Sequence, residues 1–327
     1  MWEHVSAIRD EAVQYAENRL TGKIKSMKTS WSKFNDATLD GLEWGSIVTL
    51  AAPSGGGKTA IANAITRDAE KNNPGQDISV LDFQFEMSNR NTGIREYSKA
   101  FRIPVKQLLS ADKNNPITQS DINKMRTYNQ TNQLQQIYQI SKAMNCEQIA
   151  EQVELFAKAT KGKPFVVTID HSILIRRGMK EKDKFETLYV LGETLTDLKR
   201  LYNVLFIILT QVNRDLDKLE RKIPGTLGNF PCKSDIWGAD SLFQHSDLVI
   251  ACVKPALQGI SYYGPDNYVV SQDLLAMHFL KSRNGIQSLL FFESNFEYMD
   301  IKEIPTPARA VSTISTGGRR TQNKNNP

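Results

Sequence analysis

Residues 52–59 have the composition of a phosphate-binding turn. They read Ala-Pro-Ser-Gly-Gly-Gly-Lys-Thr and lie between an apolar run, residues 47–51, and a helix-like stretch, residues 60–65. Successive glycines let the backbone curl so that its N–H groups converge on phosphate oxygens, and the helix N-terminus adds partial positive charge. Lys58 can reach the β- and γ-phosphates, and the Thr59 hydroxyl can bind Mg²⁺. The segment predicts a P-loop for a nucleoside triphosphate, whose contacting residues are Pro53, Ser54, Gly55, Gly56, Gly57, Lys58, Thr59 and Ala60.

Polar residues at the ends of three later apolar runs could complete a hydrolytic site. These residues are Glu86, Asp170 and Gln211. The carboxyl ends of parallel strands line one crevice, so Asp170 would bind the metal there, Glu86 would deprotonate a water, and Gln211 would sense the γ-phosphate. Asp82 shares a strand face with Glu86, but Glu86 is favoured because it ends its run. For Asp170 and Gln211, the alternative is an ordinary turn residue at a strand end.

A tight turn near the C-terminus carries two cations. Residues 281–285 read Lys-Ser-Arg-Asn-Gly, and strand alternation places Lys281 and Arg283 on the same side. A guanidinium at a turn tip can reach the nucleotide of a neighbouring subunit, where such a group is worth about 10³–10⁵ in rate. Two solvated hairpin side chains are the alternative interpretation.

The bulk composition is that of an ordinary globular protein. The chain has 327 residues, of which 40% are hydrophobic and 24% charged. The longest apolar run, residues 204–209, is too short to span a bilayer, and the N-terminus lacks a secretory signal pattern. The 3 cysteines are widely spaced and fit a reducing compartment, so a cytoplasmic location without a membrane partner is predicted. The net charge of +5 permits a polyanionic partner without demonstrating one.

Strand-like and helix-like segments alternate along the chain. Buried strands are predicted at residues 47–51, 78–81, 165–169, 204–209 and 248–253, and helices at 91–101, 146–159 and 185–202. This alternation predicts an α/β fold with a mainly parallel twisted sheet flanked by helices. Residues 274–280 and 289–293 predict a closing hairpin, and the polar segment 111–136 is compatible with a surface helix.

Three parts of the chain differ in character. Residues 1–29 contain an amphipathic helix, residues 5–20, which has no core of its own and must lie on its own domain or on a neighbouring subunit. Residues 30–304 form the main domain. Residues 305–327 are rich in Ser, Thr, Gly and Asn, carry cations and no acid, and are predicted to be a disordered basic tail.

The series of motifs resembles the RecA-fold motor domain of DnaB-like replicative helicases over about residues 30–300. Phe-Glu-Met-Ser at 85–88 resembles the family's Leu-Glu-Met-Pro/Ser, and Ile-Asp-His at 169–171 its Ile-Asp-Tyr. Ser-Asp-Ile at 234–236 and Gln-His-Ser-Asp at 244–247 resemble its Ser-Asp-Leu/Ile and Gln-x-x-Asp block. Thr-Gln-x-Asn-Arg at 210–214 and the Lys-x-Arg-Asn-Gly turn follow in the same order.

The resemblance implies an ATP-dependent, hexameric DNA helicase that moves 5′→3′ on single-stranded DNA. Lys58, Thr59 and Asp170 would hold ATP and Mg²⁺, Glu86 would activate water and Gln211 would couple hydrolysis to movement. Lys281 and Arg283 would act in trans on the adjacent subunit. The N-terminal helix is similar to the linker helix that packs on the neighbour and closes the ring, through head-to-tail contacts.

Two loops would line the DNA channel by the same resemblance. The first is basic and offers Arg176, Arg177 and Lys180 for phosphate contacts, with a solvated charge run as the alternative. The second has Trp237 and Gly238 where the family usually has Arg-Glu. This tryptophan could stack on a base, worth about 1–3 kcal/mol, or pack in an interface.

The sequence also departs from the family and leaves alternatives open. Ala52 replaces the usual first glycine of the P-loop. Many members carry an N-terminal domain that binds primase and forms a collar, whereas this chain starts at the linker helix. We therefore expect either a motor-only helicase of a phage or mobile element, or a collar on another chain, with a primase or helicase loader as partner. A RecA/RadA-like recombination ATPase that forms DNA filaments and a KaiC-like regulatory ATPase are the rival functions.

Overall fold

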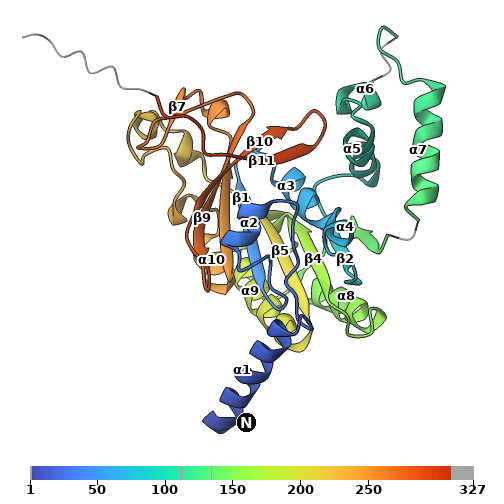
Figure 1. The fold of residues 1–327 in the computed structure, drawn as a ribbon, viewed down its shortest axis with the longest axis vertical. Coiled ribbons are helices and arrows are strands. Elements are labelled where there is room, and N and C mark those ends of the chain that lie inside the picture. Colours follow the sequence, from blue (N-terminus) through green and yellow to red (C-terminus); the bar gives the residue numbers. More distant parts are fainter. Residues whose placement is uncertain (1, 111–112, 134, 311–327) are drawn as a thin grey trace, which may run out of the picture.

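The computed structural model describes residues 2–110, 113–133 and 135–310 and is built around one large sheet. The sheet is nine-stranded, in the order β11-β10-β9-β6-β1-β5-β4-β2-β3 (Figure 1). The strands from β6 to β3 pair in parallel, while β9, β10 and β11 add an antiparallel edge. The predicted α/β fold with a mainly parallel sheet is therefore confirmed.

The strands of this sheet follow the apolar runs of the sequence. Their bounds are β1 Ile47–Ala52, β2 Ser79–Gln84, β3 Ile137–Ile140, β4 Phe165–Asp170, β5 Val204–Gln211, β6 Leu248–Val253, β9 Leu274–Ser282, β10 Leu289–Asn295 and β11 Asp300–Ile304. A separate small hairpin consists of β7 Tyr262–Tyr263 and β8 Tyr268–Val269. The central strands β1, β2, β4 and β6 are buried along their whole length, as expected of parallel strands covered on both faces.

Helices occupy both faces of the sheet and also extend beyond it. Their bounds are α1 Val5–Leu20, α2 Ser32–Ala37, α3 Lys58–Thr66, α4 Ala69–Asn72, α5 Asn89–Phe101, α6 Val105–Leu109, α7 Gln119–Thr131, α8 Cys146–Ala159, α9 Lys184–Leu201 and α10 Ala239–His245. The alternate residues of β5 show the layering. Leu205 and Ile207 belong to the apolar cluster with α3, whereas Phe206 and Ile208 belong to the cluster with α8 and α9.

Strand register brings the predicted site residues to the carboxyl edge of the sheet. Ala52, the last residue of β1, lies opposite Gln211 in β5. Gln84, the last residue of β2, lies opposite Asp170 in β4. The P-loop, the predicted metal ligand and the predicted sensor therefore meet where the parallel strands end.

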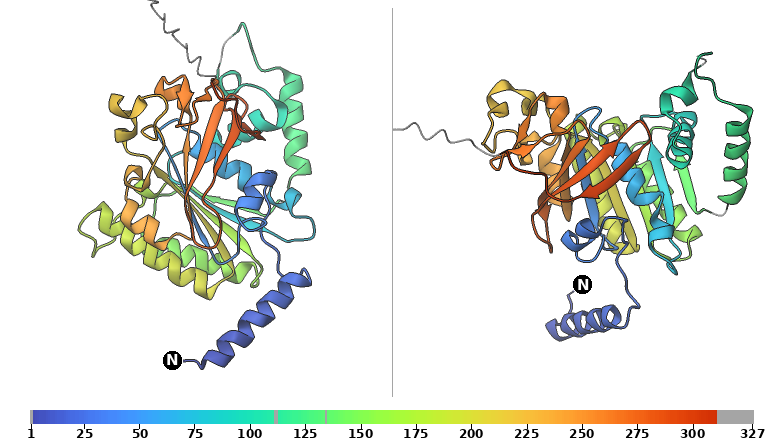
Figure 2. Two further views of the ribbon diagram at one scale, coloured as in Figure 1. Left: turned by 60° about the vertical axis from the view of Figure 1, so that its left-hand side comes forward. Right: turned by 45° about the horizontal axis from the view of Figure 1, so that its top comes forward.

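Two helical parts stand away from the sheet. Helix α1 projects from the body, and α5, α6 and α7 form a lateral excursion (Figures 1 and 2). No residue of α1 is buried. Arg19 and Tyr15 connect it to Glu43, at 3.1 Å and 3.2 Å.

Short edge elements and the C-terminus differ most from the sequence-based expectations. Strands β3 and β11 were not predicted, because Ile-Tyr-Gln-Ile and Asp-Ile-Lys-Glu-Ile are short and partly polar, as solvent-facing edge strands commonly are. Residues 308–310 hydrogen-bond to the β8 region. The rest of the predicted tail, residues 311–327, lies outside the described residues. Among the described helices, none has the length and apolar character needed to cross a membrane.

Candidate functional site

The P-loop curls between β1 and α3 with backbone donors facing its interior. Gly55 and Gly57 adopt φ values of +75° and +85°, a region that favours glycine. The first hydrogen bond of α3 runs from the Ile61 N–H to the Gly57 carbonyl, at 2.9 Å. The amides at the start of α3, including those of Lys58 and Thr59, precede this bond and have no helical acceptor. The loop therefore has the donor arrangement that binds phosphate.

Thr59 and Asp170 form an oxygen pair directly beneath the P-loop. The Thr59 hydroxyl donates to Asp170 Oδ2 at 2.5 Å, and Asp170 is 1% exposed. Within the described chain, Asp170 Oδ1 has no hydrogen-bond partner. Burial raises the pKa of Asp170 to about 6, although the Thr59 hydrogen bond and the charge of Lys58 oppose this. A hydroxyl and an unpartnered carboxylate oxygen are hard ligands of the kind that Mg²⁺ takes, so these residues fit the predicted metal.

Lys58 and Glu86 contact each other at the mouth of the same site. Lys58 Nζ lies 3.3 Å from Glu86 Oε2, which also lies 3.5 Å from His171 Nε2. Burial lowers the pKa of His171, and so does the nearby Lys58 ammonium, which keeps the imidazole neutral. Glu86 lies two residues beyond the end of β2 and is partly exposed, so its carboxylate can reach a water near the P-loop.

The second acid of β2, Asp82, is tied up in a buried network. It is 3% exposed, receives Arg67 Nη2 at 2.9 Å and Gln84 Nε2 at 3.1 Å, and also accepts from the Thr168 hydroxyl. Asp82 therefore anchors α3 to the sheet from below, while Glu86 remains near Lys58.

Gln211 ends β5 beside the start of the P-loop. Its backbone carbonyl accepts the Trp237 N–H at 2.9 Å, and the Thr210 hydroxyl donates to the Trp237 carbonyl at 3.3 Å. The turn at Trp237 and Gly238 is thus attached to the strand that ends in the predicted sensor.

Lys281 and Arg283 lie at the opposite edge of the sheet from the P-loop of their own chain. The end of β9 pairs with Leu248 at the start of β6, and Leu248 lies opposite Val48 in β1. The P-loop begins after Ala52, four residues further along β1, a rise of about 13 Å. Neither cation can therefore reach the nucleotide site of the same subunit.

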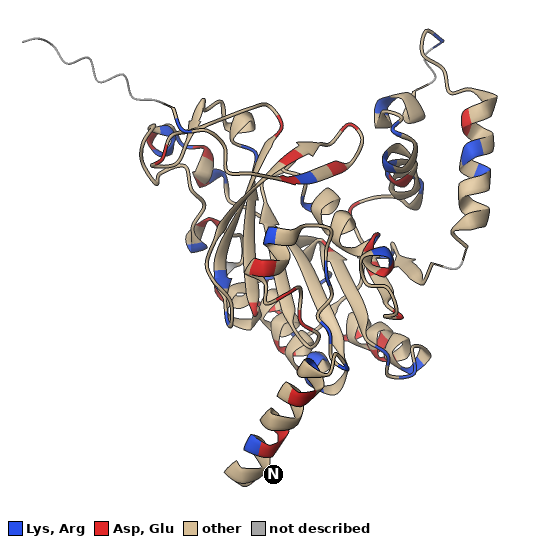
Figure 3. Cartoon of the chain, in the orientation of Figure 1, with Lys and Arg blue, Asp and Glu red and all other residues tan. Residues whose placement is uncertain are grey.

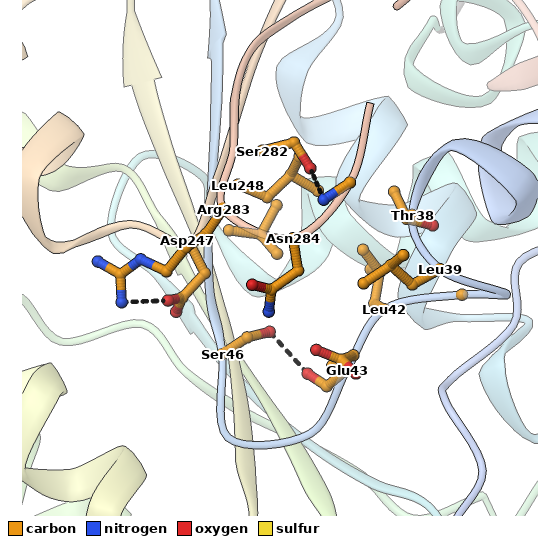
Figure 4. A pocket seen from close by; sticks show the side chains of 13 residues that line it. Thr38, Leu39, Leu42, Glu43, Ser46, Asp247, Leu248, Ser282, Arg283 and Asn284 are labelled. Atoms are coloured by element: carbon orange, nitrogen blue, oxygen red, sulfur yellow. Dashed lines mark hydrogen bonds and ion pairs between the residues drawn. The ribbon is translucent and has the colours of Figure 1, made fainter. Parts of the chain in front are cut away.

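Both cations are held by their own subunit. Arg283 Nη1 contacts Asp247 Oδ1 at 2.9 Å beside a shallow pocket (Figure 4). Asp247 also receives Lys199 Nζ and the Ile47 N–H, at 2.5 Å and 2.9 Å. Lys281 Nζ donates to backbone carbonyls at the end of α10.

The predicted DNA-contacting residues come from two loops that meet through Phe185. Arg176, Arg177 and Lys180 are exposed in the segment that leads into α9. The Trp237 ring stacks on Phe185, the second residue of α9, with centroids 5.5 Å apart, and Gly238 packs on the same helix. Elsewhere the charged residues of both signs are interspersed (Figure 3).

Sequence reasoning missed three residues that contact the predicted ones. His171 was quoted within a motif, but its contact with Glu86 depends on the path of the chain after β4. Asp247 was likewise part of a motif, and its pairing with Arg283 depends on how β9 pairs with β6. Phe296, in the turn after β10, lies so close to Gly57 that an added Cβ would be 2.0 Å from its ring. No local sequence signal marks this last contact.

The fold and the P-loop site define the chain as a P-loop NTPase with a RecA-like fold. A family model for the DnaB-like helicase C-terminal domain matches residues 26–300. The chain therefore belongs to the DnaB-like helicase C-terminal domain family. No curated protein resembles it closely enough to count as a match.

Solved structures share this fold at low sequence identity. One of them, an isolated ATPase domain, aligns with a TM-score of 0.74 and 18% identity, covering 90% of this chain and 98% of that one. A DnaB-like replicative helicase, described with its interactions with primase, aligns at 0.75 and 19%, covering 90% and 68%. A KaiC-like protein, PH0186 of Pyrococcus horikoshii OT3, aligns at 0.51 and 16%, covering 86% and 98%.

Proposed function

We propose that this chain is the ATP-driven motor of a hexameric replicative DNA helicase. It translocates 5′→3′ on single-stranded DNA and unwinds the duplex, with ATP hydrolysed at the interfaces between subunits. The observation that carries the proposal is the division of the site. The phosphate cradle and the acids occupy one edge of the sheet, and Arg283 occupies the other, about 13 Å or more away along the strands.

Each residue of the cradle has a role that follows from its contacts. Lys58 exchanges its contact with Glu86 for the β- and γ-phosphates when ATP binds, which frees Glu86 to orient and deprotonate a water. Thr59 and Asp170 hold Mg²⁺, which neutralises charge on the phosphates when bound. Gln211 hydrogen-bonds to the γ-phosphate or the water and passes the change to the turn at Trp237.

Arg283 and Lys281 act on the nucleotide of the adjacent subunit. Arg283 is half-exposed, and Asp247 keeps Lys199 and the Ile47 N–H as partners when the guanidinium leaves. Release of Arg283 therefore does not leave a partly buried carboxylate unpaired. A cation supplied in this way stabilises the charge that develops in phosphoryl transfer.

Helix α1 provides the contact that assembles the subunits. It projects from the body without a buried residue, and its apolar side chains are exposed along its length (Figure 2). Packing on the neighbouring subunit would bury this stripe. A primase or a helicase loader is the further partner that we infer, since a structural relative is described with primase.

The test is the ATPase activity of the wild type and two variants, with and without single-stranded DNA. We expect strand-stimulated hydrolysis in the wild type and its loss in both Glu86→Gln and Arg283→Ala. In mixtures, Arg283→Ala subunits should lower activity more than in proportion to their share, because each one disables a neighbour. Proportional dilution would contradict catalysis in trans, and full activity of an isolated monomer would refute the motor.

Two rival functions make different predictions. A RecA/RadA-like recombination ATPase would form helical filaments on DNA, which electron microscopy distinguishes from closed six-fold rings. A KaiC-like regulatory ATPase, whose fold the chain shares, would bind no single strand and show no strand stimulation.

A further inference from the structure

Phe185 presents one open ring face beside the basic segment of residues 176–182. Its side chain is 59% exposed although it lies in the first turn of α9. Its other face stacks on Trp237, with centroids 5.5 Å apart and ring planes inclined by 26°. Because every nucleic-acid base has a π-face, a ring that is supported behind and open in front is a surface for base stacking.

The charged side chains around Phe185 are sorted by sign. The acids of the segment are engaged locally. Glu181 accepts from the Gly178 N–H at 2.8 Å, Asp183 accepts from the Glu186 N–H at 2.9 Å, and Glu186 accepts from the Lys182 N–H at 2.5 Å. Within the described residues, no carboxylate forms an ion pair with the exposed cations of this segment, which are Arg176, Arg177, Lys180 and Lys182.

Trp237 is fixed as the support of this ring. Its N–H donates to the Gln211 carbonyl at 2.9 Å, and its carbonyl accepts from Thr210. The next residue, Gly238, has a φ of +70° and lies so close to α9 that a Cβ would be 2.2 Å from Leu188 Cδ1. Trp237 is therefore held between α9 and the end of β5, and its stacked face is covered by Phe185.

We propose that Phe185 stacks on a base of single-stranded DNA, that Trp237 supports it from behind, and that the cations of residues 176–182 bind the flanking phosphates. This inference rests on the proposed function and adds a residue to its strand site. It also changes the role predicted for Trp237, from a direct contact to a support. Stacking would fix the strand at a defined distance from Gln211, because Trp237 contacts Phe185 and is hydrogen-bonded to the Gln211 carbonyl.

The experiment compares two oligonucleotides, oligo(dT) and a matched oligomer with abasic positions, bound in Mg²⁺ and a non-hydrolysable ATP analogue. We expect Phe185→Ala to weaken oligo(dT) binding about 5- to 150-fold, without changing the slope of log K against log salt. Phe185→Tyr should retain affinity, since it keeps the ring. Lys180→Ala should instead reduce the slope by about 0.7, because it removes one phosphate contact. Tyr138→Ala, at a 50% exposed aromatic on the far edge strand β3, is the matched control and should bind as the wild type does.

The abasic oligomer decides the mechanism. We expect the wild type and Phe185→Ala to bind it equally, because it has no base to stack. An equal loss on both oligomers, or no loss on oligo(dT), would overturn stacking while leaving strand binding intact. If the wild type bound neither oligomer in a salt-dependent way, the proposed function would fail as well, so the two failures are distinguishable.

Discussion

The buried carboxylate of Asp170 should destabilise the nucleotide-free protein in a pH-dependent way, and Asp170→Asn should remove that dependence. Burial raises the pKa of Asp170 from its ordinary value of 3.8 to about 6. A folded-state pKa above the unfolded one means that the folded state binds the proton more tightly. The stability from this group is therefore fully present below the unfolded pKa and is lost as the pH rises through about 6.

The size of the effect follows from the two pKa values. A rise from 3.8 to about 6 corresponds to a total loss of about 3 kcal/mol of unfolding free energy at high pH. Between about pH 4.5 and about pH 8, roughly 2 kcal/mol of it is lost. The amide of Asp170→Asn has its own hydrogen-bonding cost, but this cost does not depend on pH. The difference between variant and wild type should therefore shift by about 2 kcal/mol in favour of the variant across this range.

Urea unfolding at both pH values, in a chelator to keep metal away, measures this shift. Asp82→Asn is the matched control, because Asp82 is equally buried on the adjacent strand but is paired with Arg67 at 2.9 Å. Its removal leaves a largely buried guanidinium without its partner, so this variant should be less stable than the wild type at both pH values. If Asp170→Asn kept a constant difference from the wild type across the range, the inference of a destabilising carboxylate would be refuted.

Three further changes test other parts of the structure. Gly57→Ala should abolish nucleotide binding in a fluorescent-nucleotide titration, because a left-handed φ costs about 1–2 kcal/mol and the new Cβ would lie 2.0 Å from Phe296; adding Phe296→Ala should restore only the steric part. Arg221→Ala should cost about 3–5 kcal/mol in urea unfolding, since Arg221 pairs with the buried Asp235 through two hydrogen bonds. Burial lowers the pKa of His278 to about 3, so its stabilising effect is lost as the pH falls below about 6.5, by about 1.4 kcal/mol per pH unit; His278→Gln should flatten acid unfolding over that range.

The sequence predicted the parts of the fold in which local pattern and burial agree. The runs at β1, β4, β5 and β6 are continuous and apolar because both sheet faces are covered, and their ends carry the polar residues Asp170 and Gln211. Helices α1 and α8 begin and end where their apolar spacing predicts. The P-loop could be predicted because its glycines, lysine and threonine are consecutive.

Contacts that depend on strand pairing or on loop paths could not be predicted in this way. Trp237 resembles a surface aromatic in sequence, yet the structure stacks it on Phe185. Phe296 is separated from Gly57 by most of the chain, and only the order of strands in the sheet brings the two together. Asp82 has the same strand-face position as Glu86, and only the placement of Arg67 on α3 explains why it is buried and paired.

The geometry of the sheet also restricts the kind of assembly in which Arg283 could serve a nucleotide. The cradle lies at the carboxyl edge of β1 and Arg283 at its amino edge, so the two surfaces that must meet are on opposite sides of one subunit. A two-fold dimer brings the same patch of each subunit together, and one compact patch cannot contain both edges. Contact between unlike surfaces is head-to-tail, and repetition of such a contact gives either a ring or a helical filament. If Arg283 acts in trans, every internal subunit both gives and receives one guanidinium, and only a closed ring leaves no cradle without a partner.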